Sequence, residues 1–334
     1  MALILWILVL LAAVWAAHWG AEHLAEPLKK LRKKWGLTGA AGGALVAIAT
    51  TMPEIGINIT SAVRGVVDIG LGAMLGANIV ALPLTITVAY AAFRTDSRTQ
   101  HMEESDGQGR GRVLRVEREA VTVQALPYLG ILLLVALVTL PAPWRGLQPV
   151  DGWIMLAAYV AYLTQAVVRG REEGERVDWT KREAWFAAAG VLVLALGAYF
   201  TVLATENIVS GLGISQLVGG LFITGTMSAL PEAFATWSVM RSGQSTAATT
   251  TIIGDQATTM TLAFLPLALV TVQLQNLRLY SVSLAALILL AIAYGTLIRW
   301  GSPEPGFTRW KVFVLCVLFV GYVVVVFLWV LPAH

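Results

Sequence analysis

Two Pro-Glu pairs stand in the middle of long apolar stretches of this sequence. Glu54 follows Pro53, and Glu232 follows Pro231. An ionised side chain at the centre of a membrane helix costs about 2.5–3.5 kcal/mol on insertion scales, so each glutamate needs a cation, a proton or another partner. Proline removes a backbone donor and displaces the carbonyl four residues earlier. Each pair therefore predicts a helix break with free backbone oxygen beside a buried carboxylate.

Hydroxyl side chains precede both pairs, namely Thr50 and Thr51 in the first and Ser228 in the second. Carboxylate, hydroxyl and carbonyl oxygens together form a hard site, which suits calcium, magnesium, manganese or sodium and suits soft metals poorly. The alternative is a simple kink with a protonated glutamate hydrogen-bonded to a neighbour. Two such glutamates at matched positions favour the ion site.

The composition predicts that helices in a lipid bilayer hold these residues. Hydrophobic residues make up 57% of the 334-residue chain and charged residues only 13%, against about 25% charged in a soluble domain. The apolar run from Ala2 to about Glu22 is predicted to be the first span rather than a cleaved leader. We predict an all-α membrane protein with ten transmembrane helices, at 3–25, 38–63, 69–93, 119–140, 151–169, 184–206, 214–240, 245–271, 279–299 and 309–331.

The distribution of Lys and Arg supports this segmentation and predicts an orientation. Cytoplasmic loops carry an excess of these residues. Of the 23 in the chain, only Arg64, Arg145 and Arg278 fall on the side opposite to the loops that follow predicted spans 1, 3, 5, 7 and 9. We therefore predict a multi-pass inner-membrane protein with both termini outside. Topology also explains the formal charge of +3 without nucleic acid as a partner.

The two Pro-Glu segments belong to an internal repeat. An offset of 178 residues superposes Pro53 on Pro231 and Gly76 on Gly254. With five predicted spans in each half, the second half must be inserted upside down, as in inverted-repeat secondary transporters, with broken helices 2 and 7 at the centre. The predicted five-helix repeats are 1–169, which includes a polar loop at 95–118, and 170–334.

These residues resemble the cation/calcium exchanger superfamily, which includes sodium/calcium exchangers. In that family one span of each alpha-repeat carries Gly-Thr-Ser-x-Pro-Glu, and the next span carries Gly-Asn-x-x-Gly-Ser-Asn. The similarity covers alpha-repeats at 38–90 and 214–270, and the ten-span plan extends it over the whole chain. It implies that two glutamates flank a divalent ion at the membrane centre, with counter-ions in neighbouring pockets. It also implies that spans 1 and 6 slide as gates.

The chain departs from the second family motif. The serine of that motif is Ala77 in the first repeat and Asp255 in the second. Four residues further on, where sodium/calcium exchangers carry Asn or Asp, stand Ala81 and Thr259. Positions 255 and 259 are one helical turn apart and share a face, so a carboxylate is shifted by one turn rather than lost. A Gly-Asp at this point also occurs in the mitochondrial-type branch of the superfamily.

Three carboxylates, Glu54, Glu232 and Asp255, are therefore expected to face one another. Such crowding favours protonation of one of them when the site is empty, so protons would compete with metal ions. The missing oxygen ligands at Ala77 and Ala81 predict fewer counter-ions per cycle, and they favour an ion that keeps part of its water, as magnesium does. The predicted metal ligands are Glu54, Glu232, Asp255, Thr50, Thr51, Ser228, Asn78, Gln256 and Thr259.

The predicted function is a secondary antiporter that exports a divalent cation, with calcium the first choice, in exchange for sodium or protons. Magnesium or manganese on the same fold stays open, as do the stoichiometry and the oligomeric state. The transported cations are the expected ligands, with no prosthetic group. A membrane-embedded enzyme could use the same carboxylates, but the sequence has no His-Glu-x-x-His motif and no nucleophile elbow. Flux without a counter-ion gradient would indicate a channel instead.

Overall fold

The computed structural model describes residues 2–36, 47–95, 113–116, 125–143, 145–169, 174, 180–241, 245–300 and 305–332, which are almost wholly helical. The chain divides into two compact units, and each unit draws on both halves of the sequence. The first comprises Met1–Ala77, Leu134–Ser228 and Gly254–Gln275, and the second comprises Asn78–Leu133, Ala229–Ile253 and Asn276–His334. The repeats at 1–169 and 170–334 are a different division of the chain and stay a prediction. Most of the 95–118 loop lies outside the described residues.

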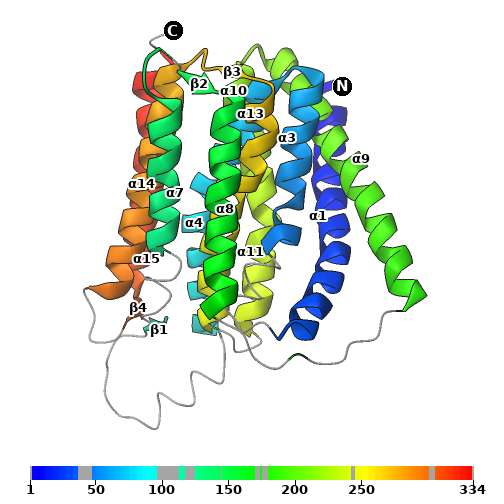
Figure 1. Ribbon diagram of the computed structural model, residues 1–334. Coiled ribbons are helices and arrows are strands. Elements are labelled where there is room, and N and C mark those ends of the chain that lie inside the picture. Colours follow the sequence, from blue (N-terminus) through cyan, green and yellow to red (C-terminus); the bar gives the residue numbers. More distant parts are fainter. Residues whose placement is uncertain are drawn as a thin grey trace. The chain divides into compact units, whose positions relative to one another are not determined.

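Two long helices of the first unit, α1 (Ala2–Lys34) and α9 (Lys181–Leu212), pack along each other in opposite directions (Figure 1). Small residues allow the close approach, because a Cβ at Gly20 would overlap the backbone of Gly190, and a Cβ at Gly197 would overlap the backbone of Ala17. Small residues at helix interfaces let membrane helices approach closely. The start of α9 is fixed by a capping box between Thr180 and the third helical residue.

The helix that carries the first Pro-Glu pair, α3 (Met52–Arg64), contacts α9 and α13 (Phe264–Leu269) in this unit. Its apolar face joins a buried cluster that includes Ile57 and Val202. The chain reverses at Gly65, whose left-handed φ of 72° closes the helix. In the same unit, α8 (Pro149–Arg169) packs on α13, and two-residue strands β2 (Gly146–Leu147) and β3 (Val272–Gln273) pair antiparallel.

Four glycines bring the first part of α4 (Val67–Thr95) against the segment that contains the second Pro-Glu pair. That segment consists of α10 (Gln216–Gly219), a π-helical turn η2 (Gly220–Thr224) and α11 (Gly225–Arg241). A Cβ at Gly72 or Gly76 would overlap the backbone of Leu221, and a Cβ at Gly220 or Gly225 would overlap the backbone of α4. The two backbones therefore touch directly, as in other small-xxx-small crossings.

The second unit contains the C-terminal helices α14 (Leu277–Arg299) and α15 (Arg309–Val325), the latter continued by a π-helical turn η4 (Val326–Val330). Buried polar groups link its helices: the hydroxyls of Ser283 and Tyr322 lie 2.9 Å apart, and Tyr294 donates to the carbonyl of Thr249. The remaining elements are α7 (Leu126–Thr139), α12 (Ser245–Thr258), and the antiparallel strands β1 (Leu114–Arg115) and β4 (Gly306–Phe307).

The described residues support a membrane location. Seven of their helices are long and apolar enough to cross a bilayer, and large apolar side chains such as Trp15, Phe313 and Trp329 are mostly exposed. Described helices overlap all ten predicted ranges, but those in 38–63, 119–140 and 151–169 are not among the seven. The membrane helices are thus observed in part, and the count of ten and the inverted repeat stay predictions.

The crossing of α4 generates a stability prediction. Gly76→Ala places a methyl group against the Leu221 carbonyl, so the two backbones must separate, and overpacking of this kind costs about 1–3 kcal/mol. We expect a clear drop in the melting temperature of the purified protein in detergent. Gly130→Ala is the matched control, because nothing described lies within 4 Å of a Cβ at that position. Equal melting temperatures for the two variants would contradict the direct backbone contact.

Candidate ion-binding site

The first Pro-Glu pair begins a new helix. Residues 47–50 are helical, the chain turns at Thr51, and α3 starts at Met52. Pro53 then falls in the first turn of α3, where a missing N–H is not needed. Glu54 lies in the same turn, where the helix dipole favours a negative charge. The predicted break at the first Pro-Glu pair is thus present.

The second Pro-Glu pair differs from this prediction. Helix α11 runs on through Pro231, and the irregular part of this span is η2, which ends seven residues before the proline. A proline can remain inside a membrane helix when neighbouring groups satisfy the carbonyl that it frees. The prediction of a second break at Pro231 is therefore wrong in its position. A further π-helical turn that the sequence did not predict, η3 (Thr259–Ala263), separates α12 from α13.

Asp255 joins the first Pro-Glu segment to α12 within the first unit. Its Oδ1 accepts hydrogen bonds from the hydroxyls of Thr50, at 2.6 Å, and Thr51, at 2.9 Å. Asp255 is 5% exposed and Thr51 is fully buried. Both hydroxyls also lie near the carbonyl of Ala47. Because each hydroxyl has one proton and two lone pairs, the threonine oxygens keep acceptor capacity for a cation while they hold this carboxylate in place.

Glu54 is a buried acidic group whose carboxylate lies outside the described hydrogen-bond network. It is 4% exposed, and neither of its carboxylate oxygens has a hydrogen-bond partner among the described residues. Asp255 is its charged neighbour, so two carboxylates interact electrostatically in a water-poor part of the protein. Burial of one unpaired charge is already costly, and a like charge nearby adds to the cost. A bound cation or proton reduces both the cost of burial and the repulsion between the two carboxylates.

Among the other predicted ligands, Asn78, Ser228, Gln256 and Thr259 are buried and Glu232 is half-buried, whereas Thr50, which bonds Asp255, is exposed. Ser228, Gln256 and Thr259 belong to the first unit with Glu54, whereas Asn78 and Glu232 belong to the second. The hydroxyl oxygen of Ser228 is buried without a hydrogen bond to any described residue. In the part of the chain that the structure describes, no three His, Cys, Asp or Glu side chains form a metal-binding group. A site that includes Glu232 therefore stays a prediction.

Sequence reasoning did not include three polar residues near this segment among the predicted ligands, namely Asn58, Ser61 and His18. Asn58 and Ser61 lie one and two turns along α3 from Glu54 and are fully or almost fully buried. His18 of α1 interacts electrostatically with Asp255, and its Nδ1 lies 3.0 Å from the carbonyl oxygen of Val14. The i, i+4 and i+7 spacing of polar residues in an apolar helix is the signal that could have identified Asn58 and Ser61.

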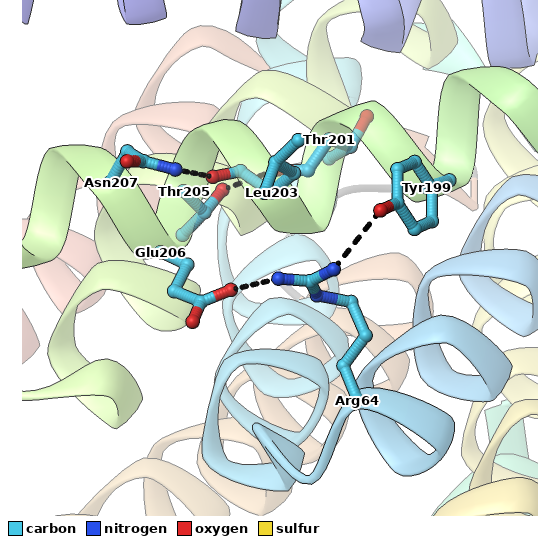
Figure 2. A network of polar contacts seen from close by, with 7 residues as sticks. All are labelled: Arg64, Tyr199, Thr201, Leu203, Thr205, Glu206 and Asn207. Carbon is cyan, nitrogen blue, oxygen red and sulfur yellow. Dashed lines mark hydrogen bonds and ion pairs between the residues drawn. The ribbon is translucent and has the colours of Figure 1, made fainter.

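Figure 2 shows how the far end of α3 is attached to α9. The Arg64 guanidinium donates to Glu206 at 2.7 Å and to the hydroxyl of Tyr199 at 3.1 Å. Asn207, next to this pair, instead donates to the carbonyl of Leu203 on its own helix. Because Arg64 and Glu206 are about a quarter to a third exposed, the ion pair contributes orientation more than stability.

The fold is shared with known cation exchangers. The sodium-calcium exchanger NCX_Mj, from a crystal soaked with 100 mM Na⁺ and 10 mM Sr²⁺, is 17% identical with a TM-score of 0.63, over 96% of this chain and 98% of that one. The H⁺/Ca²⁺ exchanger CAX is 17% identical with a TM-score of 0.64, over 96% of this chain and 80% of that one. The chain therefore has the fold that these two proteins share.

The family follows from the sequence. The model of the sodium/calcium exchanger protein family matches residues 4–168 and 183–328. The chain belongs to this family, which confirms the resemblance seen in its motifs, and it is a transporter rather than an enzyme. A comparison with curated proteins finds no match.

The hydrogen bonds to Asp255 can be tested without a transport assay. Thr51→Val keeps the side-chain shape but removes a donor to a buried carboxylate, which costs about 1–3 kcal/mol, so we expect a lower melting temperature. Thr51→Ser keeps the hydroxyl, so its melting temperature should be close to that of the wild type. Thr201→Val is the control, because among the described residues this equally buried hydroxyl bonds only the carbonyl of Gly197. An equal effect of Thr51→Val and Thr201→Val would contradict a specific role for the Asp255 contact.

Proposed function

We propose that this protein is an antiporter of the inner membrane, with both termini outside, that exports calcium in exchange for sodium or protons. The observation that carries the proposal is the buried Glu54 carboxylate, which has no described hydrogen-bond partner and has Asp255 as a charged neighbour. Oxygen ligands of this kind suit hard cations. Family membership supports an exchange of cations rather than another reaction.

Charge balance explains why such a site exchanges ions rather than releasing them freely. Glu54 and Asp255 together bring two negative charges when both are ionised. One calcium ion, two sodium ions or two protons neutralise them equally well. An unoccupied, fully ionised site is unfavourable in hydrocarbon, so the protein is expected to change its access side only when it is loaded. Because the empty site cannot return across the membrane, export of one cation requires import of another, and transport is a coupled exchange.

We assign the remaining predicted ligands to the same site. Glu232 would add a carboxylate and Asn78 an amide oxygen, and Ser228, Gln256 and Thr259 would add further neutral oxygens. Helices α1 and α9 would move as one body, a role that their close glycine contacts support. The hydroxyls of Thr50 and Thr51 would hold Asp255 in position in every occupied state.

A transport assay with a neutral substitution tests this proposal. Purified protein is reconstituted in liposomes, and uptake of calcium, magnesium and manganese is measured separately under imposed sodium and proton gradients. We expect gradient-driven calcium flux in the wild type and at least a tenfold loss in Glu54→Gln, which removes the charge but little volume. Glu26→Gln is the control, because this carboxylate is exposed and pairs with Lys29 on the same helix.

The outcomes separate the alternatives. Flux of magnesium or manganese that exceeds calcium would replace the substrate but keep the exchange mechanism. Flux that persists without any sodium or proton gradient would indicate a channel. Normal flux in Glu54→Gln would contradict the site itself.

A further inference from the structure

The buried polar face of α3 extends beyond the proposed exchange site. Glu54, Asn58 and Ser61 follow one another at spacings of four and three residues, so they lie on the same face of the helix. Their exposed fractions are 4%, 1% and 0%. The stripe runs from the Pro-Glu turn toward the end of α3 at Gly65, on the side that the charge distribution predicts to be outside. Of these three residues, only Glu54 takes part in the proposed exchange mechanism.

The amide of Asn58 is held in a fixed orientation. Its Nδ2 donates to the carbonyl of Ala263, the last residue of the π-helical turn η3, and lies 3.8 Å from the sulfur of Met74. With the nitrogen engaged in this way, Oδ1 points away from Ala263. This oxygen is buried and has no hydrogen-bond partner within the described ranges.

Ser61 supplies a second oxygen of the same kind. Its Oγ is buried and forms no hydrogen bond with any residue that the structure describes. A helical serine can usually donate to the carbonyl four residues earlier, so an unbonded, fully buried hydroxyl is uncommon. Two neighbouring oxygens in this state carry a desolvation penalty that a ligand can remove.

Gly70 of α4 shows that the two oxygens border the same space. A Cβ placed on Gly70 would lie 2.8 Å from Asn58 Oδ1 and 3.0 Å from Ser61 Oγ. Ser61 Cβ lies 2.9 Å from the same point. Both oxygens are therefore near one point beside α4, and a side chain at position 70 would cover them.

We propose that Asn58 Oδ1 and Ser61 Oγ form a binding position for a monovalent hard cation, sodium, along α3 from Glu54. The two side-chain ligands are an amide oxygen and a hydroxyl, both neutral, and a site without a carboxylate favours one positive charge over two. The role of this ion as the exchanged counter-ion rests on the proposed function, whereas its binding does not. Sodium held here is one to two helical turns from the carboxylate that would receive it.

Equilibrium binding of ²²Na⁺ to the purified full-length protein in detergent tests the proposal directly. Ser61→Ala removes one ligand without breaking a described hydrogen bond, and Gly70→Ala places a methyl group against both oxygens. We expect about one sodium ion fewer per protein at saturation in Gly70→Ala, and at least a tenfold weaker affinity for that ion in Ser61→Ala. Gly130→Ala, in open surroundings on α7, should leave the binding curve unchanged.

The melting temperature distinguishes a cation from a buried water molecule. Ser61→Ala should keep or raise the melting temperature without sodium, and it should lose part of the stabilisation that sodium gives to the wild type. Wild-type sodium binding in both Ser61→Ala and Gly70→Ala, or no sodium binding by the wild type, would overturn the proposal. If Gly70→Ala does not fold, the Ser61→Ala curve decides alone.

Failure of this inference is distinguishable from failure of the proposed function. If liposomes show gradient-driven exchange but the variants bind sodium normally, only the α3 position is wrong. If the variants lose a sodium ion while wild-type liposomes show no exchange of divalent cations, the position stands and the antiport mechanism is wrong.

Discussion

A carboxylate buried in an apolar protein interior without a hydrogen bond is the constraint on which the rest of this structure depends. Glu54 is such a group among the described residues, and Asp255 next to it makes the local charge more unfavourable. No arrangement of neutral side chains removes this cost fully, because buried charges need an opposite charge or a proton. A bound cation or proton therefore stabilises the protein at this point, and in a cation exchanger the transported ions can supply this charge.

Several local features keep this unfavourable group in place. The turn at Thr51 places Glu54 in the first turn of α3, where the helix dipole opposes part of the cost. The threonine hydroxyls fix Asp255, and glycines on α4 allow the second Pro-Glu segment to pack directly against that helix. These contacts hold the two carboxylates in place despite the cost of burying them.

Part of the geometry could be predicted from the sequence. Pro53 correctly predicted the break before Glu54, and Asp255, which the sequence predicted to be a ligand, accepts hydrogen bonds from two other predicted ligands, Thr50 and Thr51. That these residues bind an ion stays a prediction. The predicted position of the break in the second Pro-Glu span was wrong. The irregular turn there is π-helical, and no single residue type in the sequence predicts such a turn.

The same limit applies to the polar stripe on α3 and to the attachment of that helix. Asn58 and Ser61 belong to no motif in the sequence. Their placement near each other follows only from the hydrogen bond of Asn58 to Ala263 and from the close approach of Gly70 to both side chains. Arg64 and Glu206 are far apart in the chain, so their pairing could not be read from local patterns. Motifs were enough to identify the family, whereas these side-chain contacts depend on tertiary packing.

Calcium binding to a double-substitution series addresses the central claim most directly, namely that Glu54 and its charged neighbour Asp255 hold one ion. Affinities are measured by ⁴⁵Ca²⁺ binding for the wild type, Glu54→Gln, Asp255→Asn and the variant with both changes. If the two carboxylates share an ion, each single change weakens binding at least tenfold, and the double change weakens it by much less than the product of the two. Wild-type affinity in either single variant, or losses that multiply as for independent sites, would contradict a shared ion.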